Sequence, residues 1–138
     1  RPDISITTDV IVGFPGETDE LFEESMSFCK EIEFAKIHVF PYSVRKGTPA
    51  AKFPNQVDGN IKKERAHRLL ELSKELEKNY MNKFIGKNLE ILVEQAKNDI
   101  SFGHTSNYLL VKLNKIYKSE DIVIAKISKV EYPYCVVE

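Results

Sequence analysis

Residues 10–18 read Val-Ile-Val-Gly-Phe-Pro-Gly-Glu-Thr, and this stretch decides the fold of the first part of the chain. A short β-branched run ended by glycine and proline is typical of a strand buried on both faces of a parallel sheet. A helix is predicted to follow, with Thr18 as its N-cap. The apolar residues at helical spacing are Leu21, Ser25, Phe28, Cys29 and Ile32. Residues 36–40 predict a second buried strand, stopped by Pro41, so the three segments form a β-α-β unit.

A loop and a long helix are predicted next. Residues 43–58 contain prolines and a glycine and show little periodicity, which is typical of a loop. The helix is expected to be capped by Asp58 or Asn60 and ended by Gly86. Its apolar stripe consists of Ile61, Leu69, Leu72, Leu76, Tyr80 and Phe84.

From Lys87 onward the hydrophobic period becomes two, which predicts strands. The predicted strands begin at Leu89 and continue over residues 108–113, 122–127 and 132–137, with turns at residues 97–99, 102–104 and 119–121. Four or five short strands in this length favour a small antiparallel β-barrel. The predicted fold class is therefore an α/β segment with a long helix, followed by a small antiparallel, OB-like barrel.

Composition restricts the class of protein. The chain has 138 residues, is 42% hydrophobic and 30% charged, and no apolar run approaches the roughly 18 residues of a membrane span. Its two cysteines, Cys29 and Cys135, are far apart, which excludes a disulfide framework and a thiolate zinc site and favours a reducing cytosol. His38 and His67 have no metal-ligand spacing and are interpreted as structural.

The net charge of −1 hides an uneven distribution. Residues 1–44 carry 3 Lys and Arg against 9 Asp and Glu, residues 45–87 carry 11 against 5, and residues 88–138 carry 6 against 7. Four of the basic residues, Lys62, Lys63, Arg65 and Arg68, lie at the start of the long helix, where the helix dipole disfavours cations. Since local stability does not explain these signs, the cluster favours an anionic partner; a solvated helix face is the alternative.

The turn at residues 13–18 lies between a predicted strand and a predicted helix, where backbone N–H groups can hold an anion. It lacks both the P-loop lysine and the third glycine of a dinucleotide fingerprint. A tight structural turn is the alternative. The chain lacks an initial Met and begins at a strand pattern, so we expect it to be a piece of a longer protein.

Residues 8–18, 40–51 and 62–65 resemble the late barrel strands of the radical S-adenosylmethionine methylthiotransferases. Residues 103–108, Gly-His-Thr-Ser-Asn-Tyr, resemble the TRAM domain that closes the same enzymes, and the match covers essentially the whole chain. Phe-Pro-Tyr-Ser at residues 40–43, followed by Arg-Lys-Gly-Thr at 45–48 and Gln56-Val57, is most similar to the branch that acts on threonylcarbamoyladenosine in tRNA.

The resemblance implies that residues 1–86 are the last β-α-β unit of a partial radical-SAM barrel with its connecting helix, and residues 87–138 a TRAM RNA-binding domain. In the parent enzyme S-adenosylmethionine is cleaved at a four-iron four-sulfur cluster, and a second such cluster in an N-terminal domain helps to supply sulfur. A methylthio group then replaces a C–H hydrogen of the adenine beside the anticodon. The expected partners are the tRNA anticodon region, the N-terminal domain and the rest of the barrel, without a membrane, in the cytoplasm.

The family's C-x-x-x-C-x-x-C triplet, which ligates the radical cluster, is absent. We therefore expect this chain alone to be inactive, with no catalytic residue and no metal ligand. Its expected roles are to form part of the cofactor wall and to bind RNA.

The resemblance and the barrel topology place five residues at the cofactor: Ile11, Val12, Gly13, Phe40 and Tyr42. Core packing is the alternative for Ile11, Val12 and Phe40. The residues expected to bind RNA are Arg45, Lys46, Lys62, Lys63, Arg65, Arg68, Lys97, His104, Thr105, Asn107, Tyr108, Lys112 and Lys118. Arg45 and Lys46 are alternatively solvated loop charges. Tyr108 is either a base-stacking residue or a half-buried strand aromatic.

Three functions remain open. The preferred one is the C-terminal part of a tRNA methylthiotransferase that converts N6-threonylcarbamoyladenosine to its 2-methylthio derivative. The second is the corresponding part of a ribosomal-protein methylthiotransferase, in which the barrel would dock a protein. The third is an RNA-binding module without chemistry of its own.

Overall fold

The computed structural model describes residues 1–138, whose contacts divide the chain into two compact units. Ile6–Glu77 form the helix–sheet unit, and Lys78–Glu138 together with Arg1–Ser5 form the barrel unit. The domain boundary expected between residues 86 and 87 stays a prediction.

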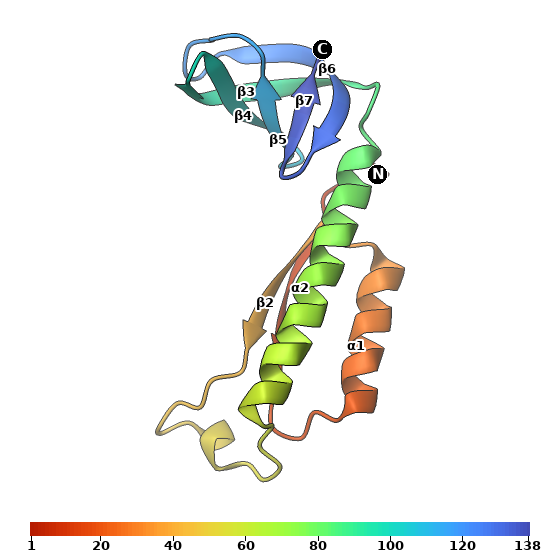
Figure 1. Ribbon diagram of the computed structural model, residues 1–138, viewed down its shortest axis with the longest axis vertical. Helices are drawn as coiled ribbons and strands as arrows, with labels where there is room; N and C mark the ends of the chain where they lie inside the picture. Colours follow the sequence, from red (N-terminus) through yellow and green to blue (C-terminus); the bar gives the residue numbers. More distant parts are fainter. The chain divides into compact units, whose positions relative to one another are not determined.

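The helix–sheet unit contains the predicted β-α-β arrangement (Figure 1). Its elements are β1 (Thr7–Val12), α1 (Asp19–Ile32), β2 (Lys36–Pro41), a 3-10 turn η1 (Pro49–Lys52) and α2 (Gly59–Asn82), whose residues from Lys78 onward belong to the barrel unit. β1 and β2 pair in parallel, with Thr7 opposite Lys36 and Val12 opposite Pro41. Neither α-helix is long and apolar enough to cross a membrane.

Local signals set the helix ends. The hydroxyl of Thr18 accepts a hydrogen bond from the Leu21 N–H at 3.2 Å, which confirms the predicted cap of α1. Asp58 or Asn60 was predicted to cap α2. The carboxylate of Asp58 accepts a hydrogen bond from the Asn60 N–H at 3.0 Å just before the helix, so Asp58 is the cap. α2 ends at Asn82, a turn earlier than the predicted stop at Gly86.

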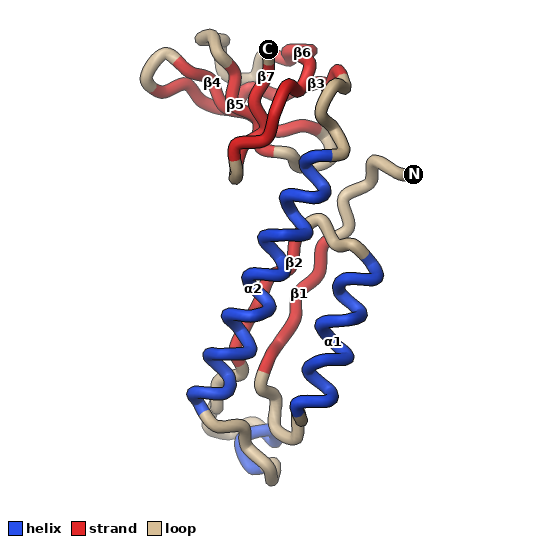
Figure 2. The backbone as a smooth tube through the Cα atoms, turned by 45° about the vertical axis from the view of Figure 1, so that its right-hand side comes forward, coloured by secondary structure: helices blue, strands red, loops and turns tan.

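Both helices cover the same face of the two-stranded sheet (Figure 2). The core between the layers consists of Val12, Phe22, Met26, Cys29, Phe34, Ile37, Ala66, Leu69, Leu72 and Leu76. The first strand was predicted to be buried on both faces and the second to be buried, but Ile11 is 55% exposed and Phe40 is 52% exposed. These two residues are register partners on the face that no helix covers.

The predicted stripe of α1 is also largely wrong. Leu21, Phe28 and Ile32 lie 40 to 55% exposed, and the residues that are buried are Phe22, Met26 and Cys29. Neighbouring residues on a helix are separated by about 100°, so α1 carries two apolar stripes, and packing against the sheet selects the one that contains Phe22. In α2, Ile61 is exposed while Leu69, Leu72 and Leu76 are buried.

A buried hydroxyl on α2 satisfies the backbone of β2. Ser73, 5% exposed, accepts from the Ile37 N–H at 3.0 Å and donates to the Ile37 carbonyl at 3.1 Å. Since both groups of one residue in a parallel strand point to the same side, this pair occupies the edge of β2 that does not face β1.

The barrel unit holds five strands closed in the order β3-β4-β5-β7-β6. Their bounds are β3 (Asn88–Lys97), β4 (Ile100–Thr105), β5 (Leu110–Leu113), β6 (Ile122–Glu131) and β7 (Tyr134–Val137). The wholly antiparallel arrangement predicted from the sequence is wrong, because β5 and β7 pair in parallel. Directions cannot alternate all the way round a closed ring with an odd number of strands, so one parallel pair is required.

The turn predicted at residues 102–104 is wrong as well, since these residues lie within β4. Gly103 is needed there for space. A Cβ atom on it would lie 2.2 Å from the carbonyl oxygen of Leu92 on the paired strand β3. The register between these strands shifts between Val93 and Gln95, so the glycine marks a close approach beside a β-bulge.

Candidate functional site

The carboxyl ends of β1 and β2 are held together by a glycine turn. Gly13 follows β1 with φ +74°, a conformation that glycine adopts without strain. A Cβ atom at Gly13 would lie 2.2 Å from Cγ of Lys62 on α2. The Tyr42 N–H donates to the Val12 carbonyl at 2.8 Å, which keeps the residue after β2 beside the end of β1.

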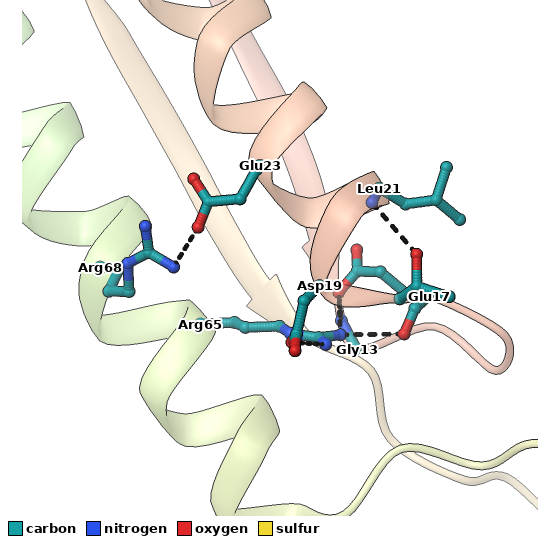
Figure 3. Close-up of polar contacts among 8 residues, drawn as sticks. Gly13, Glu17, Asp19, Leu21, Glu23, Arg65 and Arg68 are labelled. Carbon is teal, nitrogen blue, oxygen red and sulfur yellow. Dashed lines mark hydrogen bonds and ion pairs between the residues drawn. The ribbon is translucent and has the colours of Figure 1, made fainter.

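A buried ion pair fastens this turn to both helices (Figure 3). One carboxylate oxygen of Glu17 accepts from the Gly13 N–H at 2.9 Å and from Nη1 of Arg65 at 2.8 Å. Nη1 of Arg65 also donates to the Glu17 carbonyl at 3.1 Å, and its Nη2 donates to Asp19 at 2.8 Å. The Arg65 and Glu17 side chains are 7% and 14% exposed.

Three of the backbone donors of the turn are therefore already used. Besides Gly13, the Gly16 N–H donates to the Asn55 carbonyl and the Glu17 N–H to the Phe14 carbonyl, each at 2.9 Å. Of the two alternatives for this segment, the structure supports the tight structural turn, with the Glu17 carboxylate as its anion.

Contrary to the expectation from the sequence, local ion pairs explain two of the four basic residues at the start of α2. Arg65 pairs with Glu17 and Asp19, and Arg68 pairs with Glu23 at 2.6 Å. Burial alone would lower the pKa of Arg65, and its hydrogen bonds with Asp19 and Glu17 outweigh that effect, so the pKa is raised. The hydrogen bond from Arg68 lowers the pKa of Glu23.

An open groove of about 420 Å³ lies at the same strand ends. It is lined by Ile11, Phe40, Pro41, Tyr42, Ser43, Arg45, Thr48 and Ala50. Three of the five residues predicted at the cofactor, Ile11, Phe40 and Tyr42, are thus brought together. Val12 and Gly13 are buried beneath them and do not line the groove.

Tyr42 carries the one polar side-chain atom that is buried without a hydrogen-bond partner, its hydroxyl oxygen. Its ring meets Phe14 edge to face at 5.3 Å between centroids, and Nζ of Lys62 donates to its carbonyl at 3.1 Å. An orphaned buried polar atom is rare in native proteins and marks a place where a ligand group or water can bind. Together with the apolar pair Ile11 and Phe40, it fits a cofactor that presents both a flat ring and polar groups.

The residues do not fit an iron–sulfur cluster. No group of three or more His, Cys, Asp or Glu side chains is placed to hold a metal. Both cysteines are free and buried, Cys29 in the helix–sheet unit and Cys135 in the barrel unit. Burial raises the pKa of Cys135 to about 11, which keeps its thiol protonated near neutral pH.

Exposed cations lie in the loop after β2 and at the start of α2, and one of them, Arg45, lines the groove. Arg45, Lys46 and Lys63 are exposed, whereas Lys62 is half-buried over the ring of Tyr42 at 5.6 Å. Lys52, in η1, is also exposed and was missed in the sequence analysis because it lies in an irregular segment. We name Arg45, Lys46, Lys52 and Lys63 the basic loop surface.

The residues predicted to bind RNA in the barrel have different environments. Lys97 and Lys118 are exposed, Lys112 is half-buried on β5, and Tyr108 is 80% exposed. His104 forms a hydrogen bond with Glu94 across β3 and β4. Thr105 is not on the surface: it is 5% exposed, and its hydroxyl accepts from the Leu109 N–H at 3.0 Å. Asn107 is half-buried and bonded to Tyr80.

Glu17, Asp19 and Tyr80 were not among the predicted site residues. Glu17 was considered only as part of the turn at residues 13–18. The signal for the ion pair is a carboxylate four residues after Gly13 combined with an arginine at a buried position of a later helix, and only the tertiary fold brings these together.

Comparison with curated proteins shows extensive similarity to methylthiotransferases. The chain is 46% identical to the threonylcarbamoyladenosine tRNA methylthiotransferase MtaB of Bacillus subtilis, over 96% of this chain and 31% of that protein. The family is clear from this match. The chain belongs to the radical S-adenosylmethionine methylthiotransferases.

Other methylthiotransferases match comparably. The tRNA-2-methylthio-N(6)-dimethylallyladenosine synthase of Bacillus velezensis is 45% identical over 94% of this chain and 25% of its own length. The ribosomal protein uS12 methylthiotransferase RimO of Desulforamulus reducens is 48% identical over 69% of this chain and 21% of its own length. No protein-family model matches the chain. It thus spans about a third or less of these methylthiotransferases.

Proposed function

We propose that this chain is the C-terminal part of a tRNA methylthiotransferase that converts N6-threonylcarbamoyladenosine, next to the anticodon, to its 2-methylthio derivative. In this proposal residues 1–86 are the end of a partial radical-SAM barrel and residues 87–138 are a TRAM domain. The observation that carries it is the match to MtaB over 96% of the chain. The segments Phe-Pro-Tyr-Ser at residues 40–43 and Arg-Lys-Gly-Thr at residues 45–48 resemble the branch that acts on threonylcarbamoyladenosine, and this similarity supports the same assignment.

The exposed face of the sheet supports the role of the helix–sheet unit. Ile11 and Phe40 lie opposite each other on the face without a helix, at the carboxyl ends of their strands. Active sites of α/β barrels lie at these ends. We propose that Ile11, Phe40 and Tyr42 form one wall of the S-adenosylmethionine site, and that Val12 and Gly13 support it from behind.

The bound cofactor and its cluster would supply a carbon-centred radical, and this chain contributes binding and orientation. Glu17 and Arg65 hold the turn behind the wall, and Tyr42 offers an unpaired hydroxyl. Because the chain lacks cluster ligands, two four-iron four-sulfur clusters would be held elsewhere in the parent protein. On its own, the chain is proposed to be inactive.

The basic loop surface is the proposed contact to tRNA phosphates in this unit. Changing Lys46 and Lys63 together to Glu should weaken binding of unmodified tRNA and flatten its salt dependence by roughly 0.7 to 0.9 log units for each lost phosphate contact. A matched double variant, Lys30→Glu with Lys36→Glu, has the same charge change but lies at the end of α1 and the start of β2. If both variants behave alike, the basic loop surface is not the contact.

Nucleoside mass spectrometry tests the reaction. In cells without the gene, tRNA should lack 2-methylthio-N6-threonylcarbamoyladenosine while N6-threonylcarbamoyladenosine accumulates. Persistence of the methylthio group would contradict the branch assignment. If the methylthio group is lost from dimethylallyladenosine instead, the chain belongs to the branch that modifies that nucleoside. The match to the Bacillus velezensis protein makes this branch the alternative.

The ribosomal-protein branch is a second candidate because RimO matches 69% of the chain. If this branch is the correct one, mass spectrometry of intact ribosomal proteins from the same cells should show unmodified uS12. A chain that binds tRNA while both modifications are unaffected would support the third possibility, an RNA-binding module without chemistry.

A further inference from the structure

The turn between β4 and β5 exposes the side chain of Tyr108 to solvent. The Thr105 N–H donates to the Leu109 carbonyl, the Tyr108 N–H donates to the Thr105 carbonyl, and the Leu109 N–H donates to the Thr105 hydroxyl, all at 3.0 Å. Three hydrogen bonds within five residues fix the backbone on both sides of Tyr108. The turn is therefore rigid before any partner arrives.

Asn107 ties this turn to the end of α2 and to the first residues of the chain. Its amide nitrogen donates to the Tyr80 hydroxyl at 3.1 Å and to the Asp3 carbonyl at 3.2 Å, and its amide oxygen accepts from the Thr105 hydroxyl. Tyr80, 6% exposed, donates to the same Asp3 carbonyl at 2.8 Å. All of these residues belong to the barrel unit. Asn107 thus has its polar groups bound within the protein.

The side chain of Tyr108 takes part in none of these hydrogen bonds and lies in solvent. Its side chain is 80% exposed, whereas Tyr80 and Phe84 are buried and Phe102 and Tyr134 stack on each other. Its φ of +67° is a left-handed conformation that strains a residue with a Cβ atom. Glycine would serve the turn without that strain and without an exposed ring. The tyrosine is therefore not explained by folding, and such strain is often kept for a binding role.

The hairpin that carries this turn contains no acidic residue. Residues 100–118 contain three lysines and no Asp or Glu, whereas residues 87–99 carry two lysines against three acidic residues and residues 119–138 carry two against four. Lys115 and Lys118 follow β5 at the Ser101 end of the hairpin, which is the end opposite the turn that presents Tyr108. An exposed aromatic ring can stack on a base of a single-stranded nucleic acid, because every base has a flat face.

We propose that Tyr108 stacks on an unpaired base of an RNA and that Asn107 is the residue that positions it. The proposal rests on the proposed function, which supplies an RNA partner, and adds where an unpaired base is held. It revises the role expected for Asn107, which acts through the turn and not by touching RNA.

Fluorescence offers a direct test because the chain contains no tryptophan. A Tyr108→Trp variant would carry a single indole, whose emission a stacked base quenches. Titration with a short single-stranded oligoadenylate should quench this emission, and the same RNA annealed into a duplex should not. The control is Ile124→Trp, at a site on β6 that is 68% exposed; its emission should stay unchanged. Equal quenching of both variants would overturn the proposal.

Affinity measurements separate the ring from the hydroxyl. Tyr108→Ala should weaken binding of the single-stranded RNA about tenfold, as expected for loss of one base–aromatic stack, and Tyr108→Phe should bind as the unaltered chain does. The slope of log affinity against log salt should not change in either variant, since no phosphate contact is lost. An unchanged affinity of Tyr108→Ala contradicts the stacking role.

The positioning role of Asn107 is tested by a double-mutant cycle. Asn107→Ala should weaken RNA binding in the presence of Tyr108 and have no further effect in the Tyr108→Ala background. Thermal unfolding must show that each variant is folded at the assay temperature. Equal losses in both backgrounds would show that Asn107 acts independently of Tyr108.

The outcomes also distinguish this proposal from the proposed function. If the unaltered chain binds neither oligoadenylate nor tRNA, RNA binding fails as a whole. If it binds both with a salt dependence that Lys46→Glu/Lys63→Glu flattens, while Tyr108→Ala has no effect, only the stacking proposal fails.

Discussion

The charge of Arg65 has a structural role in the folded protein that the sequence alone does not reveal. In the sequence it is one of four cations at the start of a helix, but in the structure its guanidinium is buried between Glu17, Asp19 and the ring of Phe22. The sequence predicts the cap Thr18 correctly because capping is local. It does not predict the Arg65 contacts, because they join residues more than 40 positions apart.

Removal of Arg65 should be strongly destabilising. The Glu17 carboxylate is almost buried, and Arg65→Met removes its charged partner. We therefore expect a loss of about 3 kcal/mol in the free energy of unfolding. The control is Arg68→Met: the side chains of Arg68 and Glu23 in its ion pair are 42% and 54% exposed, so the loss should be much smaller. Urea unfolding of both variants measures the difference, and equal losses would contradict the role given to the buried pair.

Cys135 should make the stability of the barrel depend on alkaline pH. Its pKa is raised by burial to about 11 in the folded state, so the folded state keeps a proton that the unfolded state loses above about pH 8.5. The stabilising contribution is complete below the unfolded pKa and is lost as the pH rises toward the folded pKa, by on the order of 2 kcal/mol.

The measurement is the free energy of unfolding at about pH 8 and at about pH 10.5. Burial raises the pKa of Tyr80 as well, which gives a slope of the same sign. Comparison with Cys135→Ala isolates the thiol: the variant should lose less stability over this range. Parallel curves for the two proteins would show that the thiol does not titrate as expected.

At the scale of elements, the strands and helices were predictable wherever one local signal decided them. The glycine after β1 and the proline that ends β2 fall at the predicted places. The predictions failed where a partner element decides. Residues 102–104 have the composition of a turn, but Gly103 is a strand residue whose missing side chain makes room for β3. Which stripe of α1 is buried likewise depends on the sheet beneath it.

Gly103 gives a test at this scale. Gly103→Ala places a methyl group against the backbone of Leu92, so β3 and β4 must separate, and we expect a loss of more than about 2 kcal/mol. Gly59→Ala is the matched control, because nothing lies within 4 Å of a Cβ atom at the first residue of α2. Thermal unfolding should show a clear decrease in Tm for the first variant only. Similar Tm values would mean that the strands adapt to the methyl group.

At the scale of the whole molecule, the helix–sheet unit has an apolar surface without a cover. Ile11 and Phe40 are each more than half exposed on the open face of a two-stranded sheet. Exposed strand edges and apolar patches promote association. We expect this chain to self-associate in solution as its concentration rises.

Sedimentation velocity measures that association. Ile11→Lys combined with Phe40→Lys should shift the chain toward the monomer at a given concentration. The control is Ile116→Lys, a change to an equally exposed apolar residue in the barrel unit. If the control dissociates the chain as well, or the double variant does not, the open face is not the contact.

The hydroxyl of Ser73 makes this sheet one-sided. Because it binds both the N–H and the carbonyl of Ile37, a new strand beside β2 would have to break two hydrogen bonds, each contributing about 1 kcal/mol, and displace α2. β1 is the other edge strand of this two-stranded sheet. We therefore expect a strand that extends this sheet to pair with β1, so that β2 remains its last strand.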